Sequence, residues 1–346
     1  MDRSVIHALL AAALFGASTP LAKLLIGDVS PLLLAGLLYL GSGLGLASVR
    51  LIRDRGWKSS ELTRAEWPWL LGAIFFGGML GPVALMFGLT QTSGSTASLL
   101  LNLEAVLTAG IAWVVFKENA DRRIVLGMAV IVAGGVVLSW PTDEGSSSSW
   151  FGPLAVALAC LCWAIDNNLT RKVSASDAFF IAATKGVIAG AVNTGLALSL
   201  GAMLPGVGTT LVTMSVGVAG YGFSLVFFVL ALRGLGTART GAYFSTAPFI
   251  GAALSLTLLG ESTSLAFWLA TGLMGWGVWL HLTEHHEHVH RHDPLEHTHP
   301  HVHDEHHQHV HSAESETSEP HEHWHKHRVL MHKHPHFPDI HHRHSH

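Results

Sequence analysis

Ten apolar segments, each long enough to cross a lipid bilayer, fill the first 282 residues of the chain. A transmembrane helix needs about 20 predominantly apolar residues. Segments of that kind lie at 4–26, 31–52, 67–90, 95–116, 122–140, 151–171, 177–201, 210–232, 237–259 and 264–282. Only 13% of the 346 residues are charged, about half the usual fraction in a soluble domain. The sequence therefore predicts an all-α membrane protein with ten transmembrane helices.

Lysine and arginine residues lie in every second loop of this ten-helix arrangement. They occur at 50–66, at 117–123, directly after the sixth segment and between the eighth and ninth, whereas the alternate loops 27–31, 91–95, 141–150, 202–209 and 260–263 contain none. Short basic loops stay on the cytoplasmic side of a membrane. We therefore expect a multi-pass protein of the cytoplasmic (inner) membrane with both termini in the cytoplasm.

The two halves of the membrane region are related by a shift of 143 residues. This shift places Leu89 on Leu232, Ala109 on Ala252 and Glu118 on Glu261. It predicts a first five-helix repeat at 4–140, a linker at 141–150 and a second five-helix repeat at 151–282. Because five is an odd number, the second repeat must be inverted in the membrane, and inverted repeats are common in secondary transporters that bind substrate near the midplane.

Two corresponding stretches resemble a known family. Residues 92–118, TSGSTASLLLNLEAVLTAGIAWVVFKE, and 236–261, GTARTGAYFSTAPFIGAALSLTLLGE, are similar to the EamA repeat of the drug/metabolite transporter superfamily. The resemblance implies ten helices, both termini inside, and secondary transport, often export of small metabolites. Pro248 matches the mid-helix proline of that family, whereas the first half has Glu104 and Ala105 there. The resemblance names no substrate.

Polar residues inside the apolar segments are the candidate substrate-binding residues, because intramembrane charges usually face a cavity or a partner. The candidates are Glu104, Asn102, Asp166, Asn167, Lys185 and Tyr243. Glu104 could bind a proton, a cation or an amine, or be a structural hydrogen-bond partner. Asp166 could belong to the site or to an interhelical polar clamp. Lys185 could neutralise either carboxylate or contact substrate, and Tyr243 could line the cavity or serve in aromatic packing.

The region 283–346 differs from the rest of the chain in composition, because all but two of the 26 histidines of the chain lie in it. The motif His-x-His recurs, and side chains two apart point the same way in an extended chain, so that each pair can chelate one cation. Imidazole suits zinc, nickel, cobalt and copper. We expect a disordered metal-binding tail, or a pH-responsive solubilising segment, with ligands among His285, His286, His288, His290, His292, His297, His299, His301, His303, His306, His307, His309, His311, His321, His323, His325 and His327.

These features favour a secondary transporter that works by alternating access in the lipid bilayer. A small organic metabolite is the leading substrate and the tail a regulator, since the membrane segments hold few metal ligands. A divalent transition-metal transporter is the first alternative, and a non-transporting membrane metal buffer or sensor is the second. No P-loop, nucleophile elbow or HExxH motif is present, so we expect no enzyme and no required cofactor. No basic nucleic-acid face is present, and the oligomeric state stays open, a homodimer included.

Overall fold

The computed structural model describes residues 3–56, 62–116, 122–140, 150–174 and 176–283, together with four short stretches of the tail at 287–292, 296–301, 321–326 and 330–335. The chain divides into two units, Met1–Glu284 and His285–His346. We describe each unit by itself.

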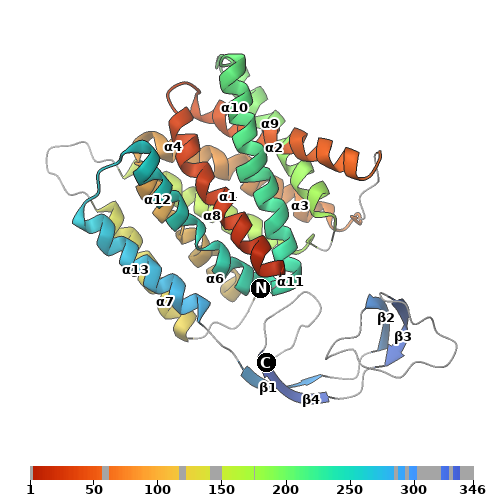
Figure 1. Ribbon diagram of the computed structural model, residues 1–346. Coiled ribbons are helices and arrows are strands. Elements are labelled where there is room, and N and C mark those ends of the chain that lie inside the picture. The colour runs from red at the N-terminus through yellow and green to blue at the C-terminus, as the bar shows by residue number, and fades with distance from the viewer. Residues whose placement is uncertain are drawn as a thin grey trace. The chain divides into compact units, whose positions relative to one another are not determined.

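The first unit is a bundle of apolar helices (Figure 1). Among its described residues, ten helical stretches are long and apolar enough to cross a membrane, and this confirms the predicted fold class. The helices are α1 Arg3–Leu25, α2 Pro31–Arg53, α3 Trp67–Ala73, η1 Ile74–Leu80, α4 Gly81–Gln91, α5 Gly94–Leu100, α6 Leu103–Phe116, α7 Arg122–Ser139, α8 Phe151–Arg171, α9 Ala178–Ser199, α10 Val207–Gly217, η2 Val218–Phe223, α11 Ser224–Phe244, α12 Ala247–Leu259 and α13 Leu265–Leu282.

Irregularities interrupt the same spans in both halves. The third and eighth spans each contain a π-helical segment, η1 and η2, and a shift of 143 residues carries Gly77 of η1 onto Gly220 of η2. The fourth span breaks at Leu101 between α5 and α6, and the ninth breaks at Ser245 between α11 and α12. π-helical turns inside α-helices are rare and often mark functional sites. Their recurrence at equivalent positions therefore directs attention to the middle of the bundle.

Helices of the two halves pack against one another in a reciprocal pattern (Figure 1). In the first half, α1 contacts η2, α11 and α12 of the second; in the second half, α8 contacts η1, α4 and α6 of the first. The pairs α2 with α9 and α7 with α13 each join equivalent helices. Such reciprocal contacts are expected of an inverted repeat. As a result, helices of both halves line the interior of the bundle.

The contact between α2 and α9 depends on glycine. A Cβ atom placed on Gly186 would lie 2.4 Å from the backbone nitrogen of Gly43, and one placed on Gly43 would lie 2.1 Å from that of Val187. Small residues at such positions let two membrane helices approach until their backbones touch, which gains van der Waals contact where lipid supplies no hydrophobic driving force.

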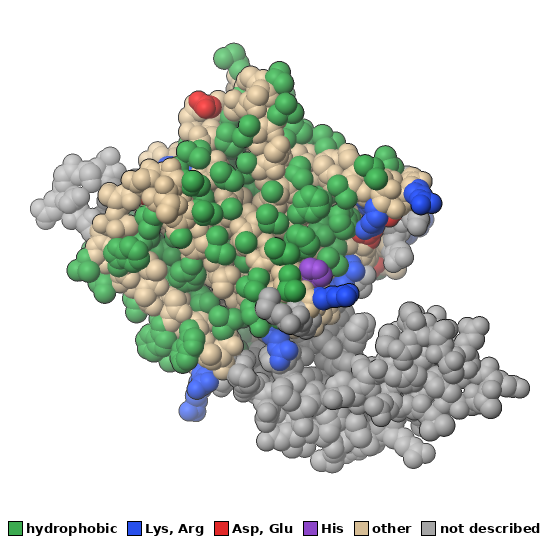
Figure 2. Space-filling model, viewed as in Figure 1, with side chains coloured by type: hydrophobic (Ala, Val, Ile, Leu, Met, Phe, Trp, Pro, Cys, Tyr) green, Lys and Arg blue, Asp and Glu red, His purple; other side chains and the backbone are tan. Residues whose placement is uncertain are grey.

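The surface of the bundle matches a bilayer environment. Figure 2 shows hydrophobic side chains spread over the face of the helical unit, with most of the visible lysine and arginine side chains along its lower and right-hand margin. We call this edge, where α2 ends and α9 begins, the basic end; it includes Arg50, Arg53 and Arg233. The edge where α4 ends and α5 begins is called the opposite end.

Within the tail, the described residues form four strands: β1 Glu287–His292, β2 Glu296–His301, β3 His321–Lys326 and β4 Leu330–Pro335. Strand β1 pairs antiparallel with β4, and β2 with β3, so that histidine lies opposite histidine in the register, for example His299 opposite His323. The remainder of the tail lies outside the described residues, and its predicted disorder stays a prediction for that part.

We predict that Gly186→Ala lowers the stability of the bundle, because the added methyl group must displace the backbone of α2; overpacking of this kind costs about 1–3 kcal/mol. The control is Gly195→Ala on the same helix, where an added Cβ would have no described atom of another helix within 4 Å. That variant should be neutral or slightly stabilising, since alanine is the better helix former. Thermal unfolding in detergent measures both, and equal unfolding temperatures for the two variants would contradict the close approach.

Candidate functional site

A cavity of about 60 Å³ lies where helices of both halves meet. Its walls come from α1, α2, α6, α8, α9, η2 and α11. The lining residues are Phe15, Tyr39, Glu104, Trp163, Asp166, Asn167, Lys185, Gly220, Tyr221, Ser224, Leu225, Phe228 and Phe244. A concave site with a largely apolar wall and a few convergent polar groups is the usual form of a small-molecule site.

An ion pair between Asp166 of α8 and Lys185 of α9 forms part of the polar wall. The Lys185 Nζ contacts Asp166 Oδ2, and Thr170 Oγ1 donates a hydrogen bond to Asp166 Oδ1 at 2.9 Å. Both charged residues are buried, at 5% and 2% exposure. A buried charge is tolerated when it is paired and hydrogen-bonded. Asp166 and Lys185 therefore neutralise each other's charge inside the bundle.

Glu104 of α6 is the second carboxylate of the cavity. It is buried, and Asn167 Nδ2 donates a hydrogen bond to its Oε1 at 2.8 Å. In the part of the chain that the structure describes, Glu104 has no ion-pair partner. Glu104 lies in the first turn of α6, where the helix dipole favours a negative charge. The site thus contains a carboxylate that is placed for a cationic ligand or a proton.

The break in the fourth span places Glu104 in that first turn. The Asn102 backbone N–H and its side-chain Nδ2 both donate to the carbonyl of Leu99, the latter at 2.9 Å, which ends α5. The side chain of Asn102 is buried at 1% exposure and is not among those lining the cavity. Asn102 therefore shapes the helix break behind the site.

The π-helical segment η1 supplies a free carbonyl at Gly77. This oxygen accepts hydrogen bonds from the Tyr39 hydroxyl at 2.8 Å and from Trp163 Nε1 at 3.0 Å. Gly77 must lack a side chain, because a Cβ atom there would lie 1.9 Å from Asp166 Oδ2. One residue of η1 thus positions two aromatic side chains and makes room for the buried carboxylate.

Six aromatic rings form a continuous wall centred on Phe15 of α1. Ring centroids of Trp163, Tyr221 and Phe244 lie 5.5, 6.0 and 5.3 Å from that of Phe15. Tyr39 contacts Tyr221 at 5.2 Å, and Phe228 contacts Phe244 at 4.9 Å. The cavity therefore has a charged wall on α6, α8 and α9 and an aromatic wall built mostly from α1, η2 and α11.

The charged wall is not repeated in the other half. The shift of 143 residues carries Ser42 onto Lys185. A Cβ on Gly77 would meet Asp166, whereas one on the equivalent Gly220 would meet Ser18. Serines thus stand in one half where the other has an ion pair.

The structure brings four of the six predicted site residues together at the cavity: Glu104, Asp166, Asn167 and Lys185. Tyr243 instead packs beside Ala8 and Leu235, while its neighbour Phe244 lines the cavity. The aromatic wall was not predicted. Its sequence signal, aromatic residues near the glycines of the third and eighth spans, also fits ordinary packing.

The predicted metal ligands all belong to the tail. His285, His286, His303, His306, His307, His309, His311 and His327 lie outside the described residues, and the other predicted ligands lie on β1, β2 and β3. Among the residues whose side chains are described, no group of three or more histidine, cysteine, aspartate or glutamate residues could hold a metal ion.

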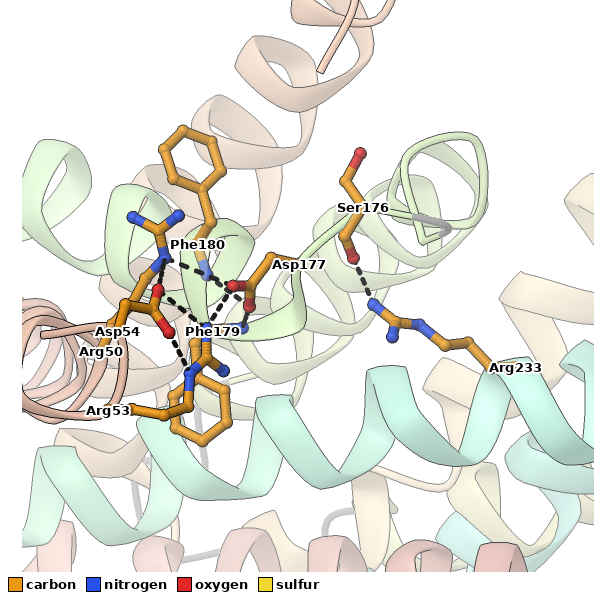
Figure 3. A network of polar contacts seen from close by, with 8 residues as sticks. All are labelled: Arg50, Arg53, Asp54, Ser176, Asp177, Phe179, Phe180 and Arg233. Atoms are coloured by element: carbon orange, nitrogen blue, oxygen red, sulfur yellow. Dashed lines mark hydrogen bonds and ion pairs between the residues drawn. The ribbon is translucent and has the colours of Figure 1, made fainter. Parts of the chain in front are cut away.

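A network of arginines and aspartates joins α2 to α9 at the basic end (Figure 3). Arg53 forms ion pairs with Asp54 and Asp177, and Arg50 pairs with both as well. Asp177 also caps α9 by accepting from the backbone N–H of Phe179 at 2.8 Å. Arg233 of α11 donates to the backbone carbonyls of Ser174 and Ser176.

Two other charged side chains hold the opposite end. Lys23 of α1 donates to the carbonyls of Leu89 and Thr92 at 2.5 and 2.8 Å, where α4 ends. Glu261, between α12 and α13, accepts from the backbone N–H groups of Gly94 and Ser95 at 2.6 and 2.8 Å, where α5 begins. Both halves are therefore tied to the turn between the third and fourth spans.

Comparison with known proteins adds a family match. The sequence profile of the EamA-like transporter family matches residues 2–140 and 150–283. An uncharacterized transporter of Methanothermobacter thermautotrophicus is 25% identical over 290 residues, covering 77% of this chain and 82% of that protein. The uncharacterized transporter YyaM of Bacillus subtilis is 27% identical over 257 residues, covering 70% and 82%.

A shorter relative and a solved structure complete the comparison. The probable 4-amino-4-deoxy-L-arabinose-phosphoundecaprenol flippase subunit ArnE of Pseudomonas aeruginosa is 34% identical over 110 residues, covering 32% of this chain and 91% of that protein. A solved crystal structure has a TM-score of 0.62 at 18% identity, covering 81% of this chain and 95% of that chain, which supports the fold alone.

We predict that the basic end loses stability in acid. Partial burial by itself raises the pKa of Asp177, but hydrogen bonds from Arg53 and from the Phe179 N–H hold that pKa below its ordinary value of 3.8. A carboxylate with a depressed folded-state pKa contributes stability above its unfolded value, which is lost as the pH falls through the folded one. The stability should therefore decrease below about pH 4.

Asp177→Asn should remove this part of the acid dependence and cost on the order of 1 kcal/mol at pH 7, since the ion pairs are partly exposed. Asp28→Asn, at an exposed loop position, is the matched control and should keep the wild-type slope. Thermal unfolding in detergent between pH 3 and 7 measures both. An unchanged slope in Asp177→Asn would show that the network is not the cause.

Proposed function

The chain belongs to the EamA-like transporter family, and on this premise we propose that it is a secondary transporter that carries a small organic solute by alternating access. The cavity between the two halves is its solute site. Glu104 binds the solute, Asn167 orients Glu104, and the Asp166–Lys185 pair forms the fixed part of the polar wall.

The observation that carries this proposal is the position of the cavity between inverted halves. Residues of α1, α2 and α6 face residues of α8, α9 and α11 across it. Rocking one repeat against the other can expose such a site to the two sides of a membrane in turn. Charged residues inside membrane spans are costly and commonly mark the path of a solute or proton, which favours the same interpretation of the cavity.

The contacts at the opposite end support alternating access. Lys23 and Glu261 together make four hydrogen bonds to backbone groups of the turn between α4 and α5. Opening the cavity toward that end requires these bonds to break. Since Glu261 holds the first residues of α5, and α5 leads through Asn102 to Glu104, a rearrangement at the opposite end would also move the binding carboxylate.

The chemistry of the cavity favours an organic solute over a metal ion. Of its described lining residues, none is histidine or cysteine, and of its two carboxylates Asp166 is already occupied by Lys185. A transition-metal path would use imidazole or thiolate ligands. Transport of a divalent transition metal remains the alternative, because the tail is rich in such ligands.

The histidine-rich tail completes the proposal as a regulatory metal-binding segment on the cytoplasmic side. Support comes from the repeated His-x-His motif of the sequence, and from the basic loops that assign both termini to the cytoplasm. Zinc, nickel, cobalt or copper would be bound there by neutral imidazoles.

The transport prediction is tested in proteoliposomes loaded with amines, amino acids, nucleobases, sugars, carboxylic acids and zinc, nickel, cobalt and copper ions. At least one organic class should leave faster than from protein-free liposomes, as measured by mass spectrometry of the external medium. Glu104→Gln should slow this efflux at least about tenfold, because it removes a charge-assisted contact. Glu66→Gln, in the loop between α2 and α3, is the control and should transport normally.

Two other results of the efflux assay would contradict this proposal. Movement of metal ions alone, abolished by Glu104→Gln, would replace the organic solute by a metal. A protein that retains its unfolding temperature but moves none of these solutes would favour the non-transporting metal buffer or sensor.

A second test concerns the tail. The full chain should retain several nickel or zinc ions after dialysis, measured by elemental mass spectrometry, and a variant ending at Thr283 should retain none, because it keeps all ten spans but lacks the histidine clusters. Efflux of the solute should persist in the shortened variant and lose any response to added metal. Equal metal retention by both proteins would locate the metal in the membrane region instead.

A further inference from the structure

With Glu104 ionised, the cavity carries one net negative charge. Two carboxylates, Glu104 and Asp166, and one ammonium group, Lys185, line it. The ammonium group and Asp166 form an ion pair. Glu104 is left with a neutral partner, Asn167, whose amide donates to one of its two oxygens. The electrostatic demand at the site is therefore for one positive charge near Glu104.

The aromatic wall also favours a cation, through the electrostatic potential of its rings. The face of an aromatic ring carries negative potential and attracts cations, more strongly where water is excluded. Six rings line the cavity, and five of their contacts with one another have centroid separations of 4.9–6.0 Å. A cation beside Glu104 could also have its apolar substituents covered by these rings.

Other classes of solute fit the same walls poorly. An anion would meet two carboxylates and find the ammonium group of Lys185 already taken by Asp166. A zwitterion would place its amine well but would have to separate that buried pair for its carboxylate, at considerable cost. A transition metal would find no imidazole or thiolate among the described lining residues. A neutral solute would leave an ionised Glu104 buried without a counter-charge, and would be accommodated only with Glu104 protonated.

We propose that the solute of this cavity is a compact organic ammonium ion, whose charged nitrogen binds the Glu104 carboxylate and whose apolar body packs against the rings around Phe15. This assignment rests on the proposed transport function and narrows it to one charge class. Glu104 and the aromatic wall together select the cation, while the Asp166–Lys185 pair excludes anions.

The test is a binding measurement on the purified full chain in detergent, where the two halves can move apart and widen the cavity of about 60 Å³ enough for a ring. The four ligands are of similar size: benzylamine, benzyl alcohol, benzoate and phenylglycine. At neutral pH these carry a positive charge, no charge, a negative charge and both charges. Benzylamine should bind at millimolar concentration or better in calorimetry and raise the unfolding temperature. The other three should bind at least about tenfold more weakly.

Two variants locate the charge recognition. Glu104→Gln should reduce benzylamine affinity at least about tenfold and leave benzyl alcohol unaffected. Phe244→Leu should weaken benzylamine about two- to fivefold through the lost cation–π contact. Asp28→Asn, which removes an exposed carboxylate elsewhere, should bind benzylamine like the wild type. If Glu104→Gln does not fold, the charge series on the wild type and the Phe244→Leu result decide.

Three outcomes would overturn the assignment: no binding of benzylamine, binding of benzyl alcohol or benzoate as tight as that of benzylamine, or tighter binding of phenylglycine. The last would show that Lys185 accepts a carboxylate. The liposome assay keeps the two proposals apart. Efflux of a neutral or anionic solute would support the transport function and contradict the assignment of an ammonium ion as the solute. Benzylamine binding without efflux of any solute would support the assignment and contradict the transport function.

Discussion

The buried ion pair between Asp166 and Lys185 is the interaction on which the interior of this protein depends. Placing either charge alone between apolar helices would cost several kcal/mol, so the side chains of α8 and α9 must reach each other beside η1, which contacts both helices. The carboxylate also requires an empty volume beside it, which Gly77 of η1 provides. The π-helical turn in turn frees the Gly77 carbonyl to hold Tyr39 and Trp163. The ion pair, the π-helical segment η1 and two rings of the aromatic wall therefore depend on one another.

Glu104 is set apart from this structure by its partner. Asp166 has a cation and a hydroxyl group, whereas Glu104 has the amide of Asn167. Two carboxylates in one cavity therefore have different surroundings, and this difference is why we propose that Asp166 is fixed within the fold and that Glu104 binds the ligand. The distinction follows from which neighbours each helix presents, since both are buried acidic side chains in apolar spans.

Much of the fold could be predicted from the sequence because lipid imposes a simple rule of length and hydropathy. The ten spans, including their approximate bounds, follow from it. The position of Glu104, Asp166, Asn167 and Lys185 in the interior could be predicted because charged and amide side chains inside a membrane span avoid lipid; their part in binding stays a prediction. Asn102 and Tyr243 could not be placed, since their orientation is set by the helix breaks at Leu101 and Ser245. The aromatic wall gave no distinct signal, because phenylalanine suits lipid, core and cavity alike.

The asymmetry of the charged wall affects the empty protein as well as the loaded one. In a perfectly two-fold inverted repeat, the conformations open to the two sides would be equal in energy and equally populated. Here the second half has an ion pair, whereas the related positions of the first half are occupied by Ser18 and Ser42. Moving the halves past each other then changes the surroundings of Asp166 and Lys185 unequally. In the alternating-access cycle that we propose, the two conformations of the empty protein would therefore differ in energy, and the ion pair would influence the return of the empty protein as well as the binding of solute.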